Sequence, residues 1–213
     1  AIRRFSFWNE RNLFLKKDAR TGKEIFSTFP EASPVQIYDH DYWWSDAWNP
    51  EDHGRDYDFS RPFFAQFYDL ALAVPRPSRE IKELLNSDYC NNSSQLKNCY
   101  LCFDCDFVEN TLYGVSFRNT RDSMDVYSAN RLEQCYFLYA CVEDYQTFFS
   151  IESDRCRESW FLRNCEDCVN CFGSVGLRHK QYYIWNKPYS KEEYEQKIKA
   201  FDLGSYQNLM RFR

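Results

Sequence analysis

Short segments that combine apolar and aromatic residues recur between residues 86 and 187. In each segment an apolar or cysteine residue precedes Tyr or Phe, and turns rich in Asn, Asp, Ser and Arg separate the segments. Stacked β coils are built from such short strands, because each coil buries its face only against its neighbours. We therefore predict a mainly β fold with a parallel β-helix, or β-solenoid, over residues 86–187. The aromatic residues of the segments fall 9 to 14 positions apart, at Tyr100, Tyr113, Tyr127, Tyr136, Phe149, Phe161, Phe172 and Tyr183.

An antiparallel β-sandwich is the main alternative. Sandwich hairpins usually have Gly or Pro in their tight turns, whereas the turns here are polar, as in residues 118–123 and 152–155. Proline is also absent between Pro77 and Pro188, which fits a ladder that uses every backbone N–H. The solenoid is the better interpretation, and the irregular spacing leaves the number of residues in one coil open.

An α+β region is expected before the solenoid, over residues 1–85. Short strands should flank a Thr21–Gly22 turn, and an irregular aromatic loop should follow over residues 38–60. Ser60 can cap a helix that has Pro62 in its first turn. The apolar face of that helix would consist of Phe63, Phe67, Leu70 and Val74.

A helical cap is expected after the solenoid, over residues 188–213. Ser190 and Glu193 have the spacing of a capping box. An apolar stripe at helical spacing follows as Tyr194, Ile198 and Phe201. We expect this helix to cover the last coil, because an open solenoid end would template edge pairing.

Composition and charge narrow the classes of protein. Aromatic residues make up 19% of the chain, which suggests that flat side chains form a large part of the interior. The formal net charge of −5 argues against general binding to nucleic acid or anionic lipid. No apolar run is long enough to span a membrane, and the start has no apolar signal segment. We expect a cytoplasmic protein without membrane contact.

All ten cysteines lie between Cys90 and Cys171. Six of them form two CxxCxxC runs, whose spacing would suit zinc or an iron–sulfur cluster. Cysteine is also a compact apolar residue that fits inward positions of a solenoid, and we favour this packing role over a metal site. The candidate metal ligands are Cys99, Cys102, Cys105, Cys165, Cys168 and Cys171.

An acidic, tryptophan-rich stretch over residues 39–58 is the best candidate for a ligand site. Its carboxylates and histidines could bind a divalent cation or act as an acid–base pair, and its tryptophans could stack on a ligand. The alternative is a loop whose aromatic residues pack on the following helix while its carboxylates face water. The candidate binding residues are His40, Asp41, Trp43, Trp44, Asp46, Trp48, His53, Asp56, Asp58 and Arg61.

Residues 1–24 are basic and contain interleaved aromatic residues, a combination that can bind single-stranded nucleic acid. A solvated strand face is the favoured interpretation. No Walker loop, GxGxxG, GxSxG or HExxH motif occurs, and no catalytic residue is predicted. His179 lies between Arg178 and Lys180 without a recognisable partner in the sequence.

Several motifs together resemble a group of uncharacterised bacterial proteins in which a zinc-ribbon segment precedes a repetitive region rich in Asn, Cys and aromatic residues. They are Trp43–Asp46, Gly54–Phe64, Asn98–Leu101 and Asn170–Gly173. The resemblance implies a repetitive β-rich body and no particular activity. No cysteine precedes Cys90, so we expect the ribbon site either to be missing or to lie before Ala1 in a longer chain.

These patterns favour a non-catalytic binding or scaffold protein that presents a rigid solenoid face to a protein or other macromolecule. The first alternative is a carbohydrate-active enzyme that uses carboxylates of residues 39–58 or of a coil face. The second is a zinc or iron–sulfur protein that contacts nucleic acid through residues 1–24. The sequence predicts no oligomeric state.

Overall fold

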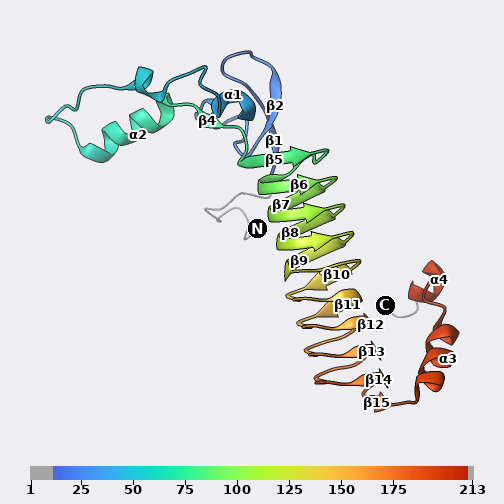
Figure 1. Ribbon diagram of the computed structural model, residues 1–213. Coiled ribbons are helices and arrows are strands. Elements are labelled where there is room, and N and C mark those ends of the chain that lie inside the picture. Colours follow the sequence, from blue (N-terminus) through green and yellow to red (C-terminus); the bar gives the residue numbers. More distant parts are fainter. Residues whose placement is uncertain (1–11, 211–213) are drawn as a thin grey trace. The chain divides into compact units, whose positions relative to one another are not determined.

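The structure of the protein is a computed structural model, in which residues 12–210 are described. The described residues form two compact units, which divide between Cys105 and Asp106. The fold is mainly β, with a β-solenoid of about nine turns and a C-terminal helix, which confirms the predicted fold class. Figure 1 shows the short strands of the coils, coloured from green to orange along the sequence.

The N-terminal unit opens with an antiparallel hairpin, which the sequence predicted around Thr21–Gly22. Asp18 stabilises the turn, because its carboxylate accepts hydrogen bonds from the Arg20 amide and the Thr21 hydroxyl. A short parallel pair follows, and two single-turn helices and one longer helix lie within the connection between its strands. The elements are β1 (Phe14–Lys17), β2 (Glu24–Ser27), β3 (Ile37–Tyr38), α1 (His40–Trp43), the 3-10 helix η2 (Pro50–His53), α2 (Phe63–Ala73) and β4 (Arg76–Pro77).

Helix α2 begins later than the sequence suggested. Pro62 occupies the N-cap position, and no side chain caps the helix. Ser60, the predicted cap, instead donates its hydroxyl and amide to the Asp58 carboxylate. The Gln66 side chain links this turn to the helix. Its oxygen accepts the Asp58 amide, and its nitrogen donates to the carbonyls of Asp58 and Arg61.

Parallel pairing has the same register in both units. Ile81 pairs with Ser93 in the N-terminal unit, and Tyr136 pairs with Phe148 in the C-terminal unit. Each partner lies twelve positions further along the chain, so one coil is a twelve-residue repeat. Strand β7 (Tyr100–Glu109) crosses the boundary between the units, after β5 (Ile81–Leu85) and β6 (Asn91–Lys97). It precedes β8 (Leu112–Arg121), β9 (Met124–Asn130), β10 (Tyr136–Tyr139), β11 (Tyr145–Ile151), β12 (Arg157–Trp160), β13 (Val169–Phe172) and β14 (Gln181–Ile184).

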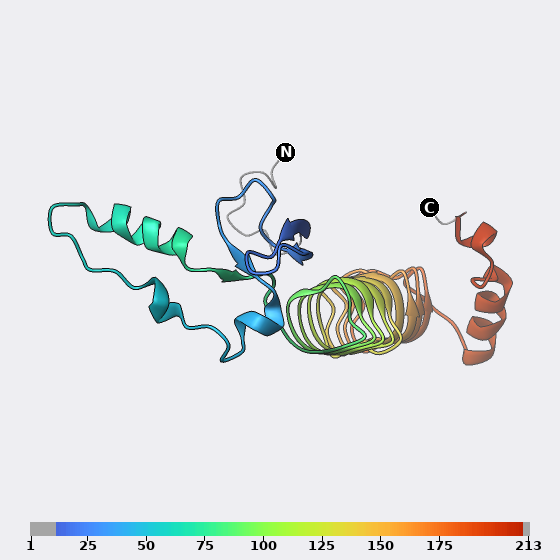
Figure 2. The ribbon, with the colours of Figure 1, turned by 90° about the horizontal axis from the view of Figure 1, so that it is seen from above.

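The backbone repeats at every third position within each coil. From Glu83 to Trp185, every third residue has a positive φ, between 47° and 61° for the residues other than glycine. Between Ser87 and Ser174 the residue that follows each of them is buried. A left-handed residue turns the chain sharply, so four such turns close one coil. In projection the coils appear as closed rings (Figure 2).

Small and aliphatic side chains fill the coils. The prediction that aromatic side chains form a large part of the interior is therefore wrong. The inward positions carry mostly Cys, Ser, Thr, Leu and Val, and Phe117 is an exception. Its ring occupies space that Gly114 leaves free. A coil this short encloses too little volume for aromatic side chains from all four sides at once. Most aromatic residues of the repeats therefore lie on the outside.

Like side chains stack in columns on the outer surface of the C-terminal unit. On the aromatic face the Phe148 and Trp160 rings stack with centroids 4.3 Å apart. On another side, side-chain amides bond from coil to coil, as between Gln134 and Gln146. A third side, the charged face, carries pairs such as Arg131 with Glu143. The aromatic face consists of Tyr136, Phe137, Phe148, Phe149, Trp160, Phe161 and Phe172.

The predicted capping box at the C-terminal helix is present, and Ser190 and Glu193 bond reciprocally. Helix α3 (Lys191–Phe201) packs against the outer surface of the last coils, where the Phe201 ring stacks on Phe172 with centroids 4.7 Å apart. The edge of β14 is covered by antiparallel pairing with β15 (Lys187–Pro188). A short helix, α4 (Tyr206–Leu209), follows.

Candidate functional site

Two of the candidate tryptophans hold the base of the 38–60 loop. The Trp43 indole donates to the Pro75 carbonyl at 2.9 Å, and the Trp48 indole donates to the Trp43 carbonyl at 2.7 Å. The Trp48 ring also packs edge-on against Tyr38 and His53. These contacts fix the loop to β3 and β4, so Trp43 and Trp48 have a structural role.

Residues 44–73, here called the aromatic arm, extend from β3 and β4 within the N-terminal unit (Figures 1 and 2). No residue of α2 is buried. Phe64 is 80% exposed and Phe59 is 93% exposed. The alternative prediction, in which the loop aromatics pack on this helix, holds only for Tyr57, whose ring contacts Phe63. The exposed large side chains of the arm are Trp44, Tyr57, Phe59, Phe63, Phe64, Phe67 and Tyr68.

The polar candidates of residues 39–61 serve local structure. Asp39 caps α1 by accepting the Asp41 amide. The pKa of Asp58 lies below its usual value because Ser60 donates hydrogen bonds to its carboxylate. Arg61 forms an ion pair with Asp69 at 2.8 Å. Four further candidates are exposed or half-buried, and within residues 12–210 their side chains have no hydrogen-bond or ion-pair partner: Asp41, Asp46, His53 and Asp56.

The basic N-terminal segment is only partly described. Arg3, Arg4 and Arg11 lie outside the described residues. Lys16 is buried, and its ammonium donates to the carbonyls of Pro30, Glu31 and Ser33. Arg20 lies over the Tyr42 ring at 4.1 Å. These two cations of the segment are therefore engaged within the N-terminal unit.

All ten cysteines are buried free thiols at inward positions, in agreement with the packing role that the sequence favoured. Most thiols donate to the carbonyl two residues earlier, as Cys105 does to Phe103 at 2.9 Å. Burial raises the pKa of Cys135 to about 12 and that of Cys141 to about 11. As the side chains stand, no three His, Cys, Asp or Glu residues within 12–210 surround a point that suits a metal ion.

One coil of the C-terminal unit has an entirely polar interior. Its inward residues are all buried, and Asp144 is the only carboxylate among them. Asp144 accepts hydrogen bonds from the Cys156 amide at 2.7 Å and from the Ser153 hydroxyl at 2.8 Å. Burial raises the pKa of Asp144 to about 6 despite these donors. The inward residues of this coil are Asp144, Thr147, Ser150 and Ser153.

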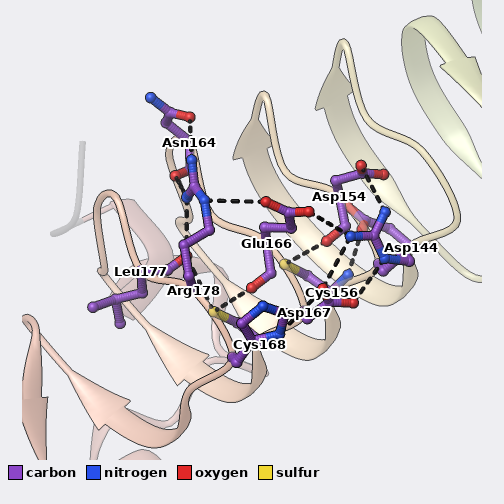
Figure 3. Close-up of polar contacts among 11 residues, drawn as sticks. Asp144, Asp154, Cys156, Asn164, Glu166, Asp167, Cys168, Leu177 and Arg178 are labelled. Carbon is purple, nitrogen blue, oxygen red and sulfur yellow. Dashed lines mark hydrogen bonds and ion pairs between the residues drawn. The ribbon is translucent and has the colours of Figure 1, made fainter.

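Figure 3 shows the charged face outside this coil, where ion pairs link successive coils. The Arg155 guanidinium contacts three carboxylates: Asp154 at 3.0 Å, Glu166 at 2.5 Å and Asp167 at 2.7 Å. His179, for which the sequence offered no partner, lies with Nδ1 3.3 Å from the Asp167 carboxylate. Cations and carboxylates alternate from coil to coil, so they neutralise one another on this face.

Asp144 and the charged face were not predicted from the sequence. The signal that reveals them is the spacing of twelve positions, which relates Arg155 to Asp167 and Asp144 to Cys156. Among the described residues, no helix is both long enough and apolar enough to cross a bilayer.

No protein-family model matches this chain, and no curated protein matches it. Its coordinates are similar to the crystal structure of a hexapeptide transferase family protein from Anaplasma phagocytophilum. The two chains are 14% identical, the match covers 57% of this chain and 86% of that one, and the TM-score is 0.19. At this TM-score the match supports no conclusion about this chain.

Proposed function

We propose that the protein is a non-catalytic binding protein whose aromatic arm docks into an apolar groove of a protein partner. The observation that carries this proposal is the exposure of α2, on which Phe63, Phe64, Phe67 and Tyr68 are all more than half exposed. Soluble proteins rarely expose contiguous apolar surface of this kind unless it mediates an interaction. An apolar helix that docks into a groove is a recurrent recognition mode.

Charges around the arm favour a partner with a basic rim. The segment that leads to α2 carries Asp46, Glu51, Asp52, Asp56 and Asp58 against Arg55 and Arg61. Anionic membrane surfaces repel such a segment, whereas Lys or Arg beside an apolar groove would attract it. A protein groove therefore fits the arm better than a lipid surface does.

The carbohydrate-active enzyme is not supported by a specific arrangement. Such enzymes need two carboxyl groups about 5–10 Å apart beside the scissile bond. The carboxylates with defined contacts are engaged otherwise: Asp58 closes a turn, Asp69 pairs with Arg61, and Asp167 pairs with Arg155.

Replacing two exposed rings of α2 tests this proposal. The double variant Phe64→Ser and Phe67→Ser removes two rings that are more than half exposed and that contact the ring of Phe63. Cross-linking followed by affinity purification and quantitative mass spectrometry should recover a partner with the wild-type chain and lose it with the variant. Tyr206→Ser, at a ring that is also exposed, is the matched control and should retain the partner.

Two outcomes would count against the arm. Equal recovery of the same partner by the wild type and the double variant would show that α2 does not contribute to binding. Flotation of the wild-type chain with vesicles of phosphatidylcholine and phosphatidylserine, abolished by the same substitutions, would show that α2 binds lipid rather than a protein groove.

A further inference from the structure

Helices α2 and α3 carry the same kind of apolar stripe. Both helices contain 11 residues, and in both the stripe has the spacing i, i+4, i+7. Side chains at this spacing lie on one face of a helix. The two helices therefore present apolar faces of similar shape. The stripes are Tyr194, Ile198 and Phe201 in α3 and Phe63, Phe67 and Leu70 in α2.

The stripe of α3 is covered, whereas that of α2 is not. Tyr194 is only 4% exposed, and the Phe201 ring stacks on Phe172 of the aromatic face with centroids 4.7 Å apart. No residue of α2 is buried, and Phe64 and Tyr68, which widen its apolar face, are 80% and 60% exposed. The protein thus shows in α3 how a helix of this type is accommodated, and it leaves a second one uncovered.

The aromatic face continues beyond the part that α3 covers. The side chains packed around α3 reach back along the face to Phe161. The Phe149 ring stacks on Phe161 with centroids 5.1 Å apart, and the Phe137 ring lies 6.0 Å from that of Phe149. The neighbouring column continues in the same register, since Tyr136 pairs with Phe148. These four side chains, here called the open rings, are Tyr136, Phe137, Phe148 and Phe149.

The open rings are continuous with a surface that already binds a helix in this chain. No charged residue interrupts either column between the open rings and the rings packed around α3. Phe137 is 55% exposed, and the other three open rings are half-buried. Aromatic side chains gain from stacking on one another in addition to the area that they bury. A second aromatic helix is therefore a chemically suitable cover for the open rings.

The length of α2 matches the open part of the face. Its 11 residues give a helix about 16 Å long at a rise of about 1.5 Å per residue. Neighbouring coils lie about 4.8 Å apart, so such a helix spans about three coils. The open part contains the coils of Phe149 and Phe137 and the coil before them, where Met124 pairs with Tyr136.

Charges beside the open rings favour one direction for a docked helix. Arg157 and Arg163 are exposed at the end of the open part that is nearer to α3, and within residues 12–210 their side chains have no ion-pair partner. Glu133 and Glu152 lie in the two preceding coils. The acidic segment that leads to α2 is attracted by the arginines and repelled by the glutamates. We therefore expect this segment to lie at the arginine end.

We propose that α2 of one chain docks on the open rings of a second copy of the same chain. This inference rests on the proposed function of the aromatic arm and names its partner. Each of the two surfaces is exposed in the single chain, so both are available to another copy. Because each copy carries one helix and one set of open rings, a reciprocal exchange of helices closes the assembly as a two-fold dimer.

Complementation between two variants tests the inference. The arm variant is Phe64→Ser with Phe67→Ser, and the face variant is Phe137→Ser with Phe149→Ser. Sedimentation velocity of the full chain over a range of concentrations should show a dimer for the wild type, and each variant should weaken the dimer about tenfold or more. An equal mixture of the two variants should form dimers again, because one helix and one set of open rings remain intact.

Serine suits the backbone of the open rings, because Ser116 and Ser128 adopt the same left-handed conformation in this solenoid. Circular dichroism verifies that each variant retains its β structure. If the face variant does not fold, Phe137→Ser alone replaces it, since this ring is more than half exposed. Tyr206→Ser, at an exposed ring outside both surfaces, is the matched control and should remain dimeric.

The outcomes separate this inference from the proposed function. A monomeric wild type whose arm variant still loses a different protein partner would overturn the inference and leave the proposed function standing. A dimer that the arm variant does not weaken would show that another surface joins the copies. Failure of the mixed variants to associate would show that contacts between two arms or between two faces hold the dimer. An arm variant that loses neither self-association nor any partner would contradict both proposals.

Discussion

The buried carboxyl of Asp144 should make the stability of the C-terminal unit depend on pH. Its pKa rises from 3.8 in the unfolded chain to about 6 in the coil because burial disfavours the charged form. The folded state therefore binds the proton more tightly. Each pH unit between the two values is worth ~1.4 kcal/mol. The free energy of unfolding should fall by about 3 kcal/mol as the pH rises through this window, and should then stay constant.

The groups that act most strongly on the Asp144 carboxyl are three neutral donors and one further carboxylate. The groups that face its carboxyl are the thiol of Cys141, the hydroxyl of Ser153 and the amide of Cys156, all neutral donors. The nearby Asp154 carboxylate raises the pKa further. Burial therefore remains the dominant cause, and the stabilising effect is complete only below the unfolded pKa.

Urea denaturation of the wild type and Asp144→Asn at several pH values measures this effect. Asparagine keeps an acceptor for the Cys156 amide and does not titrate. The variant should match the wild type near pH 4 and exceed it by about 2–3 kcal/mol at pH 7. Asp122→Asn, which removes an exposed carboxyl, should show no such pH-dependent difference. A difference between Asp144→Asn and the wild type that stays constant from pH 4 to 7 would refute the reasoning.

Three further substitutions test the packing, the charged face and the helix cap. Gly114→Ala places a Cβ 2.3 Å from the Phe117 ring and should lower the free energy of unfolding, measured by urea denaturation, by about 1–3 kcal/mol. Adding Phe117→Leu should restore part of this loss. If the second substitution restores nothing, a clash with the Phe117 ring is not the cause. Arg155→Ala leaves three carboxylates without their shared cation and should lower Tm, with a smaller difference in molar salt; a salt-independent change would point to packing instead. Ser190→Ala should cost about 1 kcal/mol of α3 stability, measured as faster amide exchange at Tyr194, and unchanged exchange would show that the cap is dispensable.

The fold class was predictable because short polar-bounded segments without proline are typical of very few architectures. The capping box at Ser190 was also readable, since it depends only on local spacing. The length of one coil could not be predicted, because the aromatic residues that were used to find the repeat belong to different columns of side chains. Within the C-terminal unit, Tyr136 and Phe172 belong to one outer column, whereas Tyr113 and Phe149 belong to its neighbour. Their spacing therefore varied although the coil is constant.

A different signal would have revealed the coil. Every third residue from Ser87 to Ser174 is small or aliphatic apart from Phe117 and Asp144. The residue before each of them adopts the left-handed conformation, and within the described residues none of these is Val, Ile or Thr. Branching at Cβ makes the left-handed conformation costly. The absence of Val, Ile and Thr from these positions therefore indicates the left-handed backbone from the sequence alone.

The role of the cysteines depended on knowing the coil length. Cys90 and Cys156 lie well before the nearest CxxCxxC run in the sequence. Once the coil length is known, they fall in line with Cys102 and Cys168, at inward positions that suit packing. The sequence predicted a ligand site over residues 39–58, and this stays a prediction. The exposed apolar surface of the aromatic arm lies on α2, while Trp43 and Trp48 anchor the base of the arm.

Because the backbone conformation repeats every three residues, the effect of an insertion or a deletion depends on the number of residues gained or lost. Loss of a single residue would turn the interior of every later coil outward. Loss of three would keep small side chains inside but rotate the outer columns by a quarter turn, so that aromatic rings would follow charges and carboxylates would follow amides. Only the gain or loss of a whole coil preserves both, which means that evolution or design can lengthen or shorten the body one complete turn at a time.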